Sequence, residues 1–244
     1  MPTVDTALSL QLYPLCDQDN AIVVVIDVLR ATSAICTAFE NGAKEMIPVA
    51  NVEEALEYQK KGFLVGAERN GEKLEGFDFG NSPYDYMDPK IKDQTLVLTT
   101  TNGTQAIEIA KDNYMVVIGA FTNITALSDW LIKQDKNIIL LCAGWKGRVN
   151  LEDSLFAGAV VERLFQSGKY ETFTDASLAA HQFFLSAEGE PGHFLRNSSH
   201  RRRLSKLNLK EDIKYCLQLD KSVQIPVLQD GVLVRLQVEE KLGA

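Results

Sequence analysis

The stretch AIVVVIDVLRATS, residues 21–33, decides how this chain folds. Residues 21–28 are apolar and mostly β-branched, with no polar alternation, which predicts a strand buried on both faces. A helix is expected over residues 31–41, because Gly42 follows it as a C-cap. Asp27 stands at the end of the strand, where a buried carboxylate is costly unless it meets a cation or hydrogen-bond donors.

The same alternation of strands and helices continues along the chain. Strands are expected at 45–50, 63–66, 95–99, 115–119 and 137–142, and helices at 52–61, 103–111, 123–133, 151–165, 174–186 and 209–219. A hairpin turned by Asp230-Gly231 is expected over 224–236, and Pro226 places its first strand at a sheet edge. We therefore predict an α/β protein with a mixed, largely parallel sheet covered by helices on both faces.

Composition limits the classes of function. The chain has 244 residues, 45% of them hydrophobic, and a net charge of −8, which argues against nucleic-acid binding. We expect one domain over 1–244, or two tightly packed halves of about 1–94 and 95–244. No signal peptide is recognised, the longest apolar run is too short for a bilayer, and four cysteines without a C-x-x-C pair suggest free thiols. A cytoplasmic protein that does not contact membranes is expected.

The turn after the first buried strand combines a candidate metal ligand with two kinds of group that bind phosphate. Ligands of open α/β sheets bind beyond the carboxyl ends of the strands. Asp27 can hold a metal ion, Arg30 offers a guanidinium, and Thr32 with Ser33 opens a helix whose N–H groups are exposed. An Asp27–Arg30 ion pair beside a threonine N-cap explains the same spacing equally well.

A second turn, TTTNGT at 99–104, has the outline of an anion cradle. Thr101, Asn102 and Thr104 surround Gly103, which lets the backbone approach an oxyanion closely, and a helix N-terminus favours negative charge. The alternative is an ordinary N-capped turn. The density of hydroxyl groups favours a functional role.

Acidic residues mark two further turns. Glu152 and Asp153 open the helix at 151–165, where such residues are usually dipole partners capped by a preceding Asn. The functional alternative is that one of them faces the pocket as a metal ligand or general acid. Glu68 follows a strand and can reach the same edge as Asp27.

Other polar features are less specific. The loop GFDFGNSP at 76–83, which contains Asn81, can fold over the site or be a glycine-rich turn anchored by its phenylalanines. The run HRRR at 200–203 can bind an anion or a partner, although such runs are more often a solvated helix face. The histidines, His181, His193 and His200, lack metal-ligand spacing and are interpreted as surface or core residues.

These segments, taken together, resemble the 2-phosphosulfolactate phosphatase family. The similar segments are DVLRATS at 27–33, GAER at 66–69, GFDFGNSP at 76–83, TTNGT at 100–104, NLED at 150–153 with Ala157-Gly158, and the stretch from Asp212 through Cys216 and Asp220 to Pro226. They occur in order over nearly the whole chain. The resemblance implies a three-layer α/β/α fold and a Mg²⁺-dependent phosphatase that converts 2-phospho-3-sulfolactate to 3-sulfolactate, a step toward coenzyme M in that family.

From the resemblance and the turns we expect Asp27 and Glu68 to hold Mg²⁺, with Glu152 or Asp153 as a further ligand. Arg30 would neutralise the phosphoryl oxygens, and Asp153 is the first candidate to protonate the leaving alkoxide. The attacking group is either a metal-activated water or Asp27. Phosphate contacts are expected from Thr32, Ser33, Asn81, Thr101, Asn102, Gly103 and Thr104, and contacts to the other acidic groups from Lys146, Arg148 and Arg201 to Arg203.

The expected partner is a small anionic phosphorylated substrate, and the oligomeric state is open, with a homodimer as one outcome. Two other functions remain open. A Mg²⁺-dependent lyase or isomerase acting on a phosphorylated hydroxyacid would turn over substrate without releasing phosphate. A non-catalytic anion-binding module would be stabilised by its ligand without any turnover.

Overall fold

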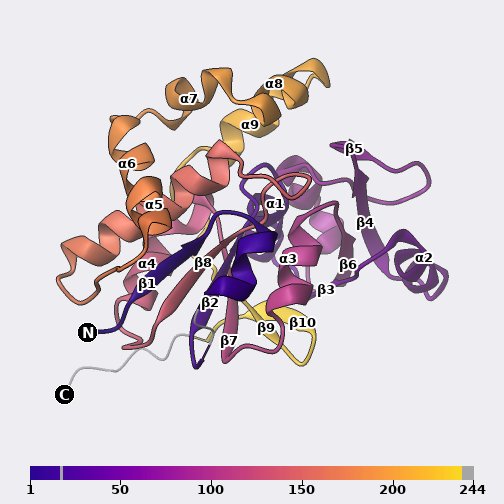
Figure 1. Cartoon of the computed structure of the whole chain (residues 1–244). Coiled ribbons are helices and arrows are strands. Elements are labelled where there is room, and N and C mark those ends of the chain that lie inside the picture. Colours follow the sequence, from indigo (N-terminus) through magenta and orange to yellow (C-terminus); the bar gives the residue numbers. More distant parts are fainter. Residues whose placement is uncertain (17–18, 238–244) are drawn as a thin grey trace.

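The computed structural model describes residues 1–16 and 19–237. Its centre is a ten-stranded mixed sheet with the order β1-β8-β2-β7-β9-β10-β3-β6-β4-β5 (Figure 1). The strands are β1 Val4–Ala7, β2 Ile22–Ile26, β3 Glu45–Pro48, β4 Leu64–Arg69, β5 Glu72–Lys73, β6 Thr95–Thr99, β7 Met115–Gly119, β8 Ile138–Cys142, β9 Pro226–Gln229 and β10 Val232–Arg235. This confirms the prediction of a mixed, largely parallel sheet.

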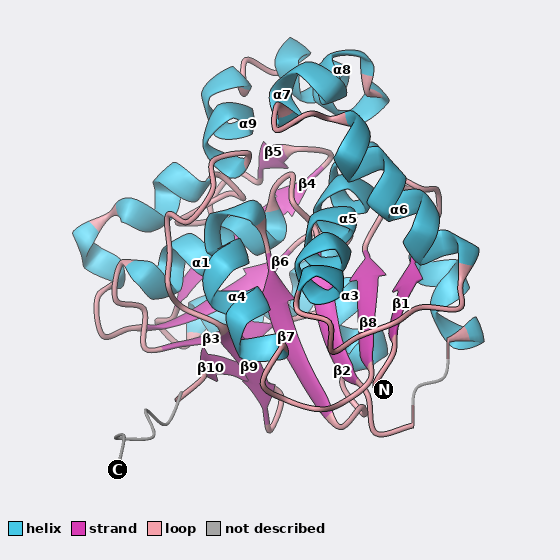
Figure 2. Ribbon diagram, turned by 90° about the vertical axis from the view of Figure 1, so that its left-hand side faces the viewer, coloured by secondary structure: helices cyan, strands magenta, loops and turns pink. Residues whose placement is uncertain are grey.

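Helices cover both faces of the sheet (Figure 2). Along β2, Val23 and Val25 pack in one core with Phe39 of a helix on one face, whereas Val24 packs with Phe156 of a helix on the other. Burial of each such side chain contributes about 1.5–3 kcal/mol. The α-helices are α1 Ala31–Glu40, α2 Val52–Lys60, α3 Gly103–Ala110, α4 Ile124–Leu131, α5 Leu151–Gln166, α6 Asp175–Ser186, α7 Pro191–Phe194, α8 Ser199–Lys206 and α9 Lys210–Cys216.

Short 3₁₀ helices complete the connections. They are η1 Leu10–Leu15, η2 Pro83–Met87, η3 Pro89–Ile91, η4 Phe121–Asn123 and η5 Leu195–Asn197. None of the helices in the described ranges is long and apolar enough to cross a membrane. The division of the chain at residues 94 and 95 stays a prediction.

Two groups of parallel strands make up the sheet, and they run in opposite senses. Strands β1, β8, β2 and β7 form one group and β3, β6 and β4 the other, with the antiparallel pair β9 and β10 between them. Sheet twist of roughly 20–25° per strand pair accumulates to about 100–125° from β2 to β6. This rotation brings the carboxyl ends of β2 and β6 back toward the same side of the molecule.

The closing hairpin differs from its prediction. Its turn, Asp230-Gly231, has positive φ angles of 49° and 80°, as expected for this dipeptide. However, β9 lies between β7 and β10, so the prediction that it forms a sheet edge is wrong. Pro226 is tolerated there because it is the first residue of the strand and β7 pairs with β9 only at Val227.

Among the strands and α-helices, the sequence did not predict β1, β5, α7 and α8. The two strands are short, with four and two residues. Helix α8 contains the basic run at 200–203 and is capped by Ser198, whose side chain accepts a hydrogen bond from the N–H of Arg201. This N-cap and two buried residues, His200 and Leu204, anchor the otherwise polar helix.

Candidate active site

A small cavity of about 20 Å³ lies where the ends of β2, β4 and β6 meet helix α8. A volume of this size holds about one water molecule. Seven residues predicted from the sequence share its lining: Asp27, Arg30, Glu68, Asn81, Thr101, Asn102 and Arg203. The remaining lining residues are Leu29, Gly71, Trp145, His200 and Leu204.

Asp27 follows β2 and is only 6% exposed. Its backbone N–H donates to the Thr32 hydroxyl, at 3.2 Å, which fixes the first turn of α1. The pKa of the Asp27 carboxyl is raised to about 7, mainly by burial and also by the carboxylates of Glu68 and Glu152, against the lowering effect of His200. No ion pair joins Asp27 to a cationic side chain within the described ranges.

Glu68 belongs to β4, which is longer than predicted, and it precedes a hairpin turn at Asn70-Gly71. Its carboxylate accepts hydrogen bonds from the N–H of Gly71 and from the N–H and hydroxyl of Thr101, the latter at 3.2 Å. These bonds tie the end of β4 to the turn after β6. They hold the Glu68 carboxylate at the cavity.

Arg30 does not form the ion pair with Asp27 that the spacing also allowed. Its guanidinium forms a buried ion pair with Asp212 of α9 and donates to the carbonyl of Gly71 at 2.6 Å. These contacts fix the plane of the guanidinium, and its remaining N–H groups are available to a ligand in the cavity.

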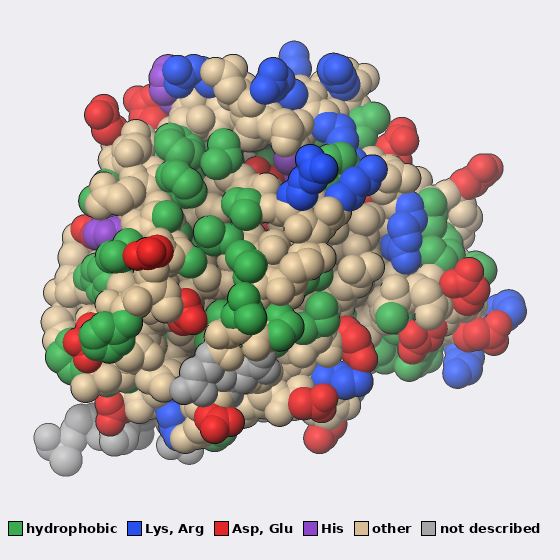
Figure 3. Space-filling model, viewed as in Figure 1, with side chains coloured by type: hydrophobic (Ala, Val, Ile, Leu, Met, Phe, Trp, Pro, Cys, Tyr) green, Lys and Arg blue, Asp and Glu red, His purple; other side chains and the backbone are tan. Residues whose placement is uncertain are grey.

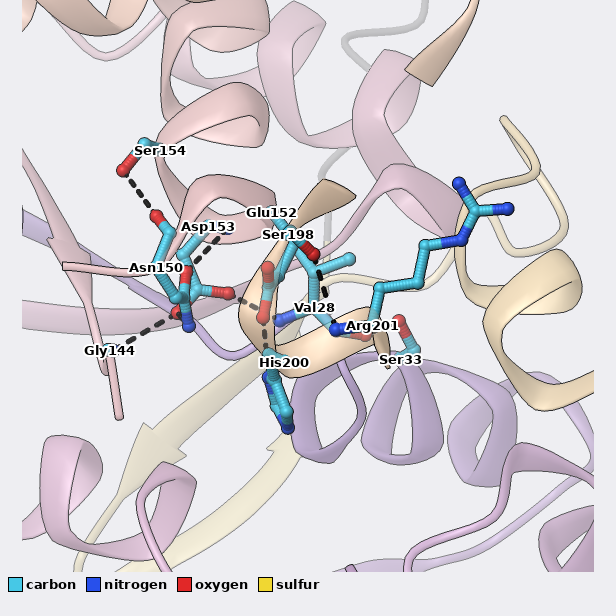
Figure 4. A network of polar contacts seen from close by, with 10 residues as sticks. All are labelled: Val28, Ser33, Gly144, Asn150, Glu152, Asp153, Ser154, Ser198, His200 and Arg201. Carbon is cyan, nitrogen blue, oxygen red and sulfur yellow. Dashed lines mark hydrogen bonds and ion pairs between the residues drawn. The ribbon is translucent and has the colours of Figure 1, made fainter. Parts of the chain in front are cut away.

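Glu152 and His200 form a buried pair behind the cavity (Figure 4). Glu152 is fully buried, and its Oε1 lies 2.5 Å from Nδ1 of His200, whereas its Oε2 has no partner in the described residues. The imidazole is stacked on Trp145 at an interplanar angle of 13°. His200 is buried, as its interpretation as a surface or core residue allows, but it also lines the cavity, which that interpretation did not anticipate.

Asp153 lies next to this pair but does not line the cavity. Its carboxylate accepts hydrogen bonds from the N–H of Val28 at 2.9 Å, from the N–H of Gly144 at 3.1 Å and from the Asn150 amide at 2.8 Å (Figure 4). Burial raises its pKa, while the Val28 and Asn150 donors act in the opposite direction. With these donors around it, the structure gives Asp153 the role of joining the turns after β2 and β8.

Three predicted phosphate ligands use their hydroxyl groups inside the turns. Thr32 accepts from the Asp27 backbone, Ser33 donates to the carbonyl of Val28 at 2.8 Å, and Thr104 donates to the carbonyl of Thr100 at 3.1 Å. None of the three lines the cavity. They shape the two helix openings.

Gly103 also acts through shape. A Cβ at this position would lie 2.5 Å from the Cβ of Ala31 and 3.1 Å from Oδ2 of Asp27. The glycine therefore lets the start of α3 approach α1 and the carboxylate more closely than any side chain would allow.

The fit to a metal ion rests on few ligands. Within the described ranges no group of three or more His, Cys, Asp or Glu residues is arranged to hold a metal ion. Asp27 and Glu68 nevertheless both line the cavity beside Asn81, whose Oδ1 is buried without a partner. Mg²⁺ is often held by only one or two carboxylates together with substrate phosphate and water. These oxygen donors fit such a site.

Comparison with known proteins gives one consistent result. Residues 9–231 match a family model described as 2-phosphosulpholactate phosphatase. The chain is 45% identical to a protein of Thermotoga petrophila, over 86% of this chain and 90% of the relative. It is 41% identical to one of Caldanaerobacter subterraneus, over 86% and 89%, and 40% identical to one of Clostridium novyi, over 82% and 86%. Each relative is named a probable 2-phosphosulfolactate phosphatase.

Proposed function

This chain belongs to the 2-phosphosulfolactate phosphatase family, and we propose that it hydrolyses 2-phospho-3-sulfolactate, or a closely similar phosphorylated hydroxyacid, to the free alcohol and phosphate. The observation that supports this most is the cavity, where Asp27 and Glu68 meet the guanidinium groups of Arg30 and Arg203. Oxygen ligands for a cation and cationic donors for an oxyanion are the two sets of groups that phosphoryl transfer needs.

We further propose that Mg²⁺ is the cofactor and that Asp27, Glu68 and Asn81 would hold it. When bound there, Mg²⁺ would neutralise phosphoryl oxygens and lower the pKa of a coordinated water. Arg30, fixed by Asp212, would direct its free N–H groups to the phosphoryl oxygens. The nucleophile is either water or Asp27, and borohydride reduction of the quenched enzyme, which converts an aspartyl phosphate to homoserine, would identify Asp27.

Proton transfer to the leaving oxygen is assigned to His200 in place of Asp153. His200 lines the cavity, and Glu152 holds its Nδ1, which leaves Nε2 to face a ligand. Asp153, by contrast, is surrounded by N–H donors. A carboxylate that orients an imidazole is a common arrangement for general acid and base catalysis.

Location and assembly are proposals as well. The four cysteines are free thiols in the structure, which supports the cytoplasm as the place of action. The homodimer stays a prediction, which the molar mass measured by light scattering would test.

The function is tested by measuring phosphate release from a panel of phosphorylated hydroxyacids, with Mg²⁺ and with EDTA. We expect release that depends on Mg²⁺ and is fastest for 2-phospho-3-sulfolactate. Turnover without phosphate release would instead support a lyase or isomerase. Thermal stabilisation by the ligand, without turnover at any Mg²⁺ concentration, would support a binding module.

A further inference from the structure

The three consecutive arginines of α8 have different environments. The guanidinium of Arg201 donates to the carbonyl of Gly192, and that of the exposed Arg202 donates to the carbonyl of Asn197 at 2.6 Å. Arg203 alone of the three lines the cavity. No hydrogen bond or ion pair joins the guanidinium of Arg203 to another residue in the part of the chain that the structure describes, and its Nε is buried without a partner.

Arg203 is nevertheless held in position. Its guanidinium carbon lies 4.7 Å from the centre of the Trp145 ring, in a cation–π contact, and Trp145 lines the same cavity. Nη1 of Arg203 lies 3.8 Å from where a Cβ of Gly71 would be. The carbonyl of the same glycine accepts a hydrogen bond from Arg30, so the two guanidinium groups approach Gly71 together.

The surroundings of Arg203 are charged, but they do not satisfy its N–H groups. The carboxylates of Asp27, Glu68 and Glu152 attract it electrostatically, and Arg30 repels it. Lys and Arg side chains also gather at the top of the molecule, around α7 and α8, although the whole chain is acidic (Figure 3). Arg203 is partly buried, and its Nε is buried without a partner in the described residues, which is costly. An oxyanion placed against this N–H group would remove that cost.

These contacts indicate that the two arginines bind different groups of the substrate. Arg30 is fixed by Asp212 beside the turn that holds Asp27, which is the place proposed for the phosphoryl group. Arg203 comes from α8, and its planar fork matches a carboxylate or a sulfonate in two-point contact. We propose that Arg203, supported by Trp145, binds the second anionic group of the substrate and so makes the enzyme select phosphorylated acids over simple phosphate esters. This inference rests on the proposed phosphatase function.

The test compares phosphate esters that carry two, one and no anionic groups besides the phosphate. They are 2-phosphosulfolactate, 2-phospholactate, and isopropyl phosphate, in which a methyl group replaces the carboxylate of 2-phospholactate. Arg203→Met keeps an apolar chain against Trp145, Arg203→Lys keeps the charge without the fork, and Lys206→Met, at an exposed position, is the matched control on the same helix. The apparent KM and kcat for phosphate release are measured separately, and thermal unfolding confirms that each variant is folded.

We expect Arg203→Met to raise KM for the two acidic substrates about 10- to 100-fold, as the loss of a charged hydrogen-bond pair implies. The kcat/KM for isopropyl phosphate should change less than about twofold, since that ester has no group for the arginine. The KM of Arg203→Lys should fall between those of wild type and Arg203→Met, and Lys206→Met should match wild type on all three esters. If Arg203→Met does not fold, Arg203→Lys provides the same comparison.

An equal loss on all three substrates, or no loss on any, would overturn the assignment of Arg203. A wild-type protein that releases phosphate from none of them contradicts the proposed function instead. In that case calorimetric titration with 3-sulfolactate still tests the subsite. Binding to wild type that is lost in Arg203→Met supports it, and binding that is absent or unchanged in the variant refutes it.

Discussion

Replacement of Asp27 by Asn should stabilise the metal-free protein while it abolishes phosphate release. Burial raises the pKa of Asp27 from its usual value of 3.8 to about 7. The folded state therefore binds a proton that the unfolded state has released between these two values, and stability falls as the pH rises from about 4 to about 7. The isosteric amide carries no charge at any pH and avoids this loss.

The size of the effect follows from the two pKa values. At about 1.4 kcal/mol for each tenfold change in proton affinity, ionised Asp27 costs about 4 kcal/mol at pH 8 and about 2 kcal/mol at pH 5.5. The stability of Asp27→Asn relative to wild type should therefore rise by about 2 kcal/mol between pH 5.5 and pH 8. Any other cost of the amide is the same at both pH values and cancels in this difference.

The assay is urea denaturation in EDTA at the two pH values, followed by tryptophan fluorescence. Asp129→Asn, at an exposed position on α4, is the matched control. Its free energy of unfolding should differ little from that of wild type, and by the same amount at both pH values. Added Mg²⁺ should stabilise wild type at pH 8 more than Asp27→Asn, because a bound cation favours the ionised carboxylate. A stability difference for Asp27→Asn that does not change with pH would refute the electrostatic account of this residue.

Four further substitutions test the surroundings of the cavity. Glu152→Gln and His200→Gln should each lower kcat for phosphate release by about 10²–10⁴-fold. The double variant should be no slower than the slower of the two single variants, because the two residues act as a unit. If the two losses in kcat multiply in the double variant, the residues have independent roles. Gly103→Ala should lower the free energy of unfolding by about 1–3 kcal/mol, since the new Cβ has no room, whereas Gly192→Ala has open space; equal denaturation midpoints would contradict this. Asp212→Asn should cost about 3–5 kcal/mol by leaving a buried guanidinium without its ion pair, and a urea midpoint equal to wild type would show that the pair is dispensable.

Local sequence was sufficient for the parts of the site that lie on the strand ends. The run at 21–28 predicts its own burial, and Asp27 and Arg30 follow it directly, so their position at the cavity depends on few other elements. Glu68 and Thr101 were also found, because polar side chains directly after apolar strands stand out. Their mutual hydrogen bond, by contrast, depends on the pairing of β4 with β6.

The sequence did not single out the residues that α8 brings to the cavity. The run at 201–203 was expected only as a whole to contact the acidic groups, and nothing in the spacing of HRRR distinguishes His200 or Arg203 from Arg202. Only the position of α8 in the fold brings His200 and Arg203 against Trp145. The opposite senses of the two strand groups were missed for a similar reason, since they depend on the hairpin 226–235, which is distant in sequence from both.

Helix α8 connects recognition to catalysis in the proposed mechanism. The cavity of about 20 Å³ holds about one water, which is less room than a phosphorylated three-carbon acid needs. His200, Arg203 and Leu204 all line the cavity from α8, and retraction of this helix would open it while removing the proton donor and the second anion contact together. A substrate that engages Arg203 would therefore draw His200 back to its leaving oxygen, whereas an ester without a second acidic group would gain less from closure. In this arrangement selectivity for phosphorylated acids appears in kcat as well as in KM, to the extent that closure limits the rate.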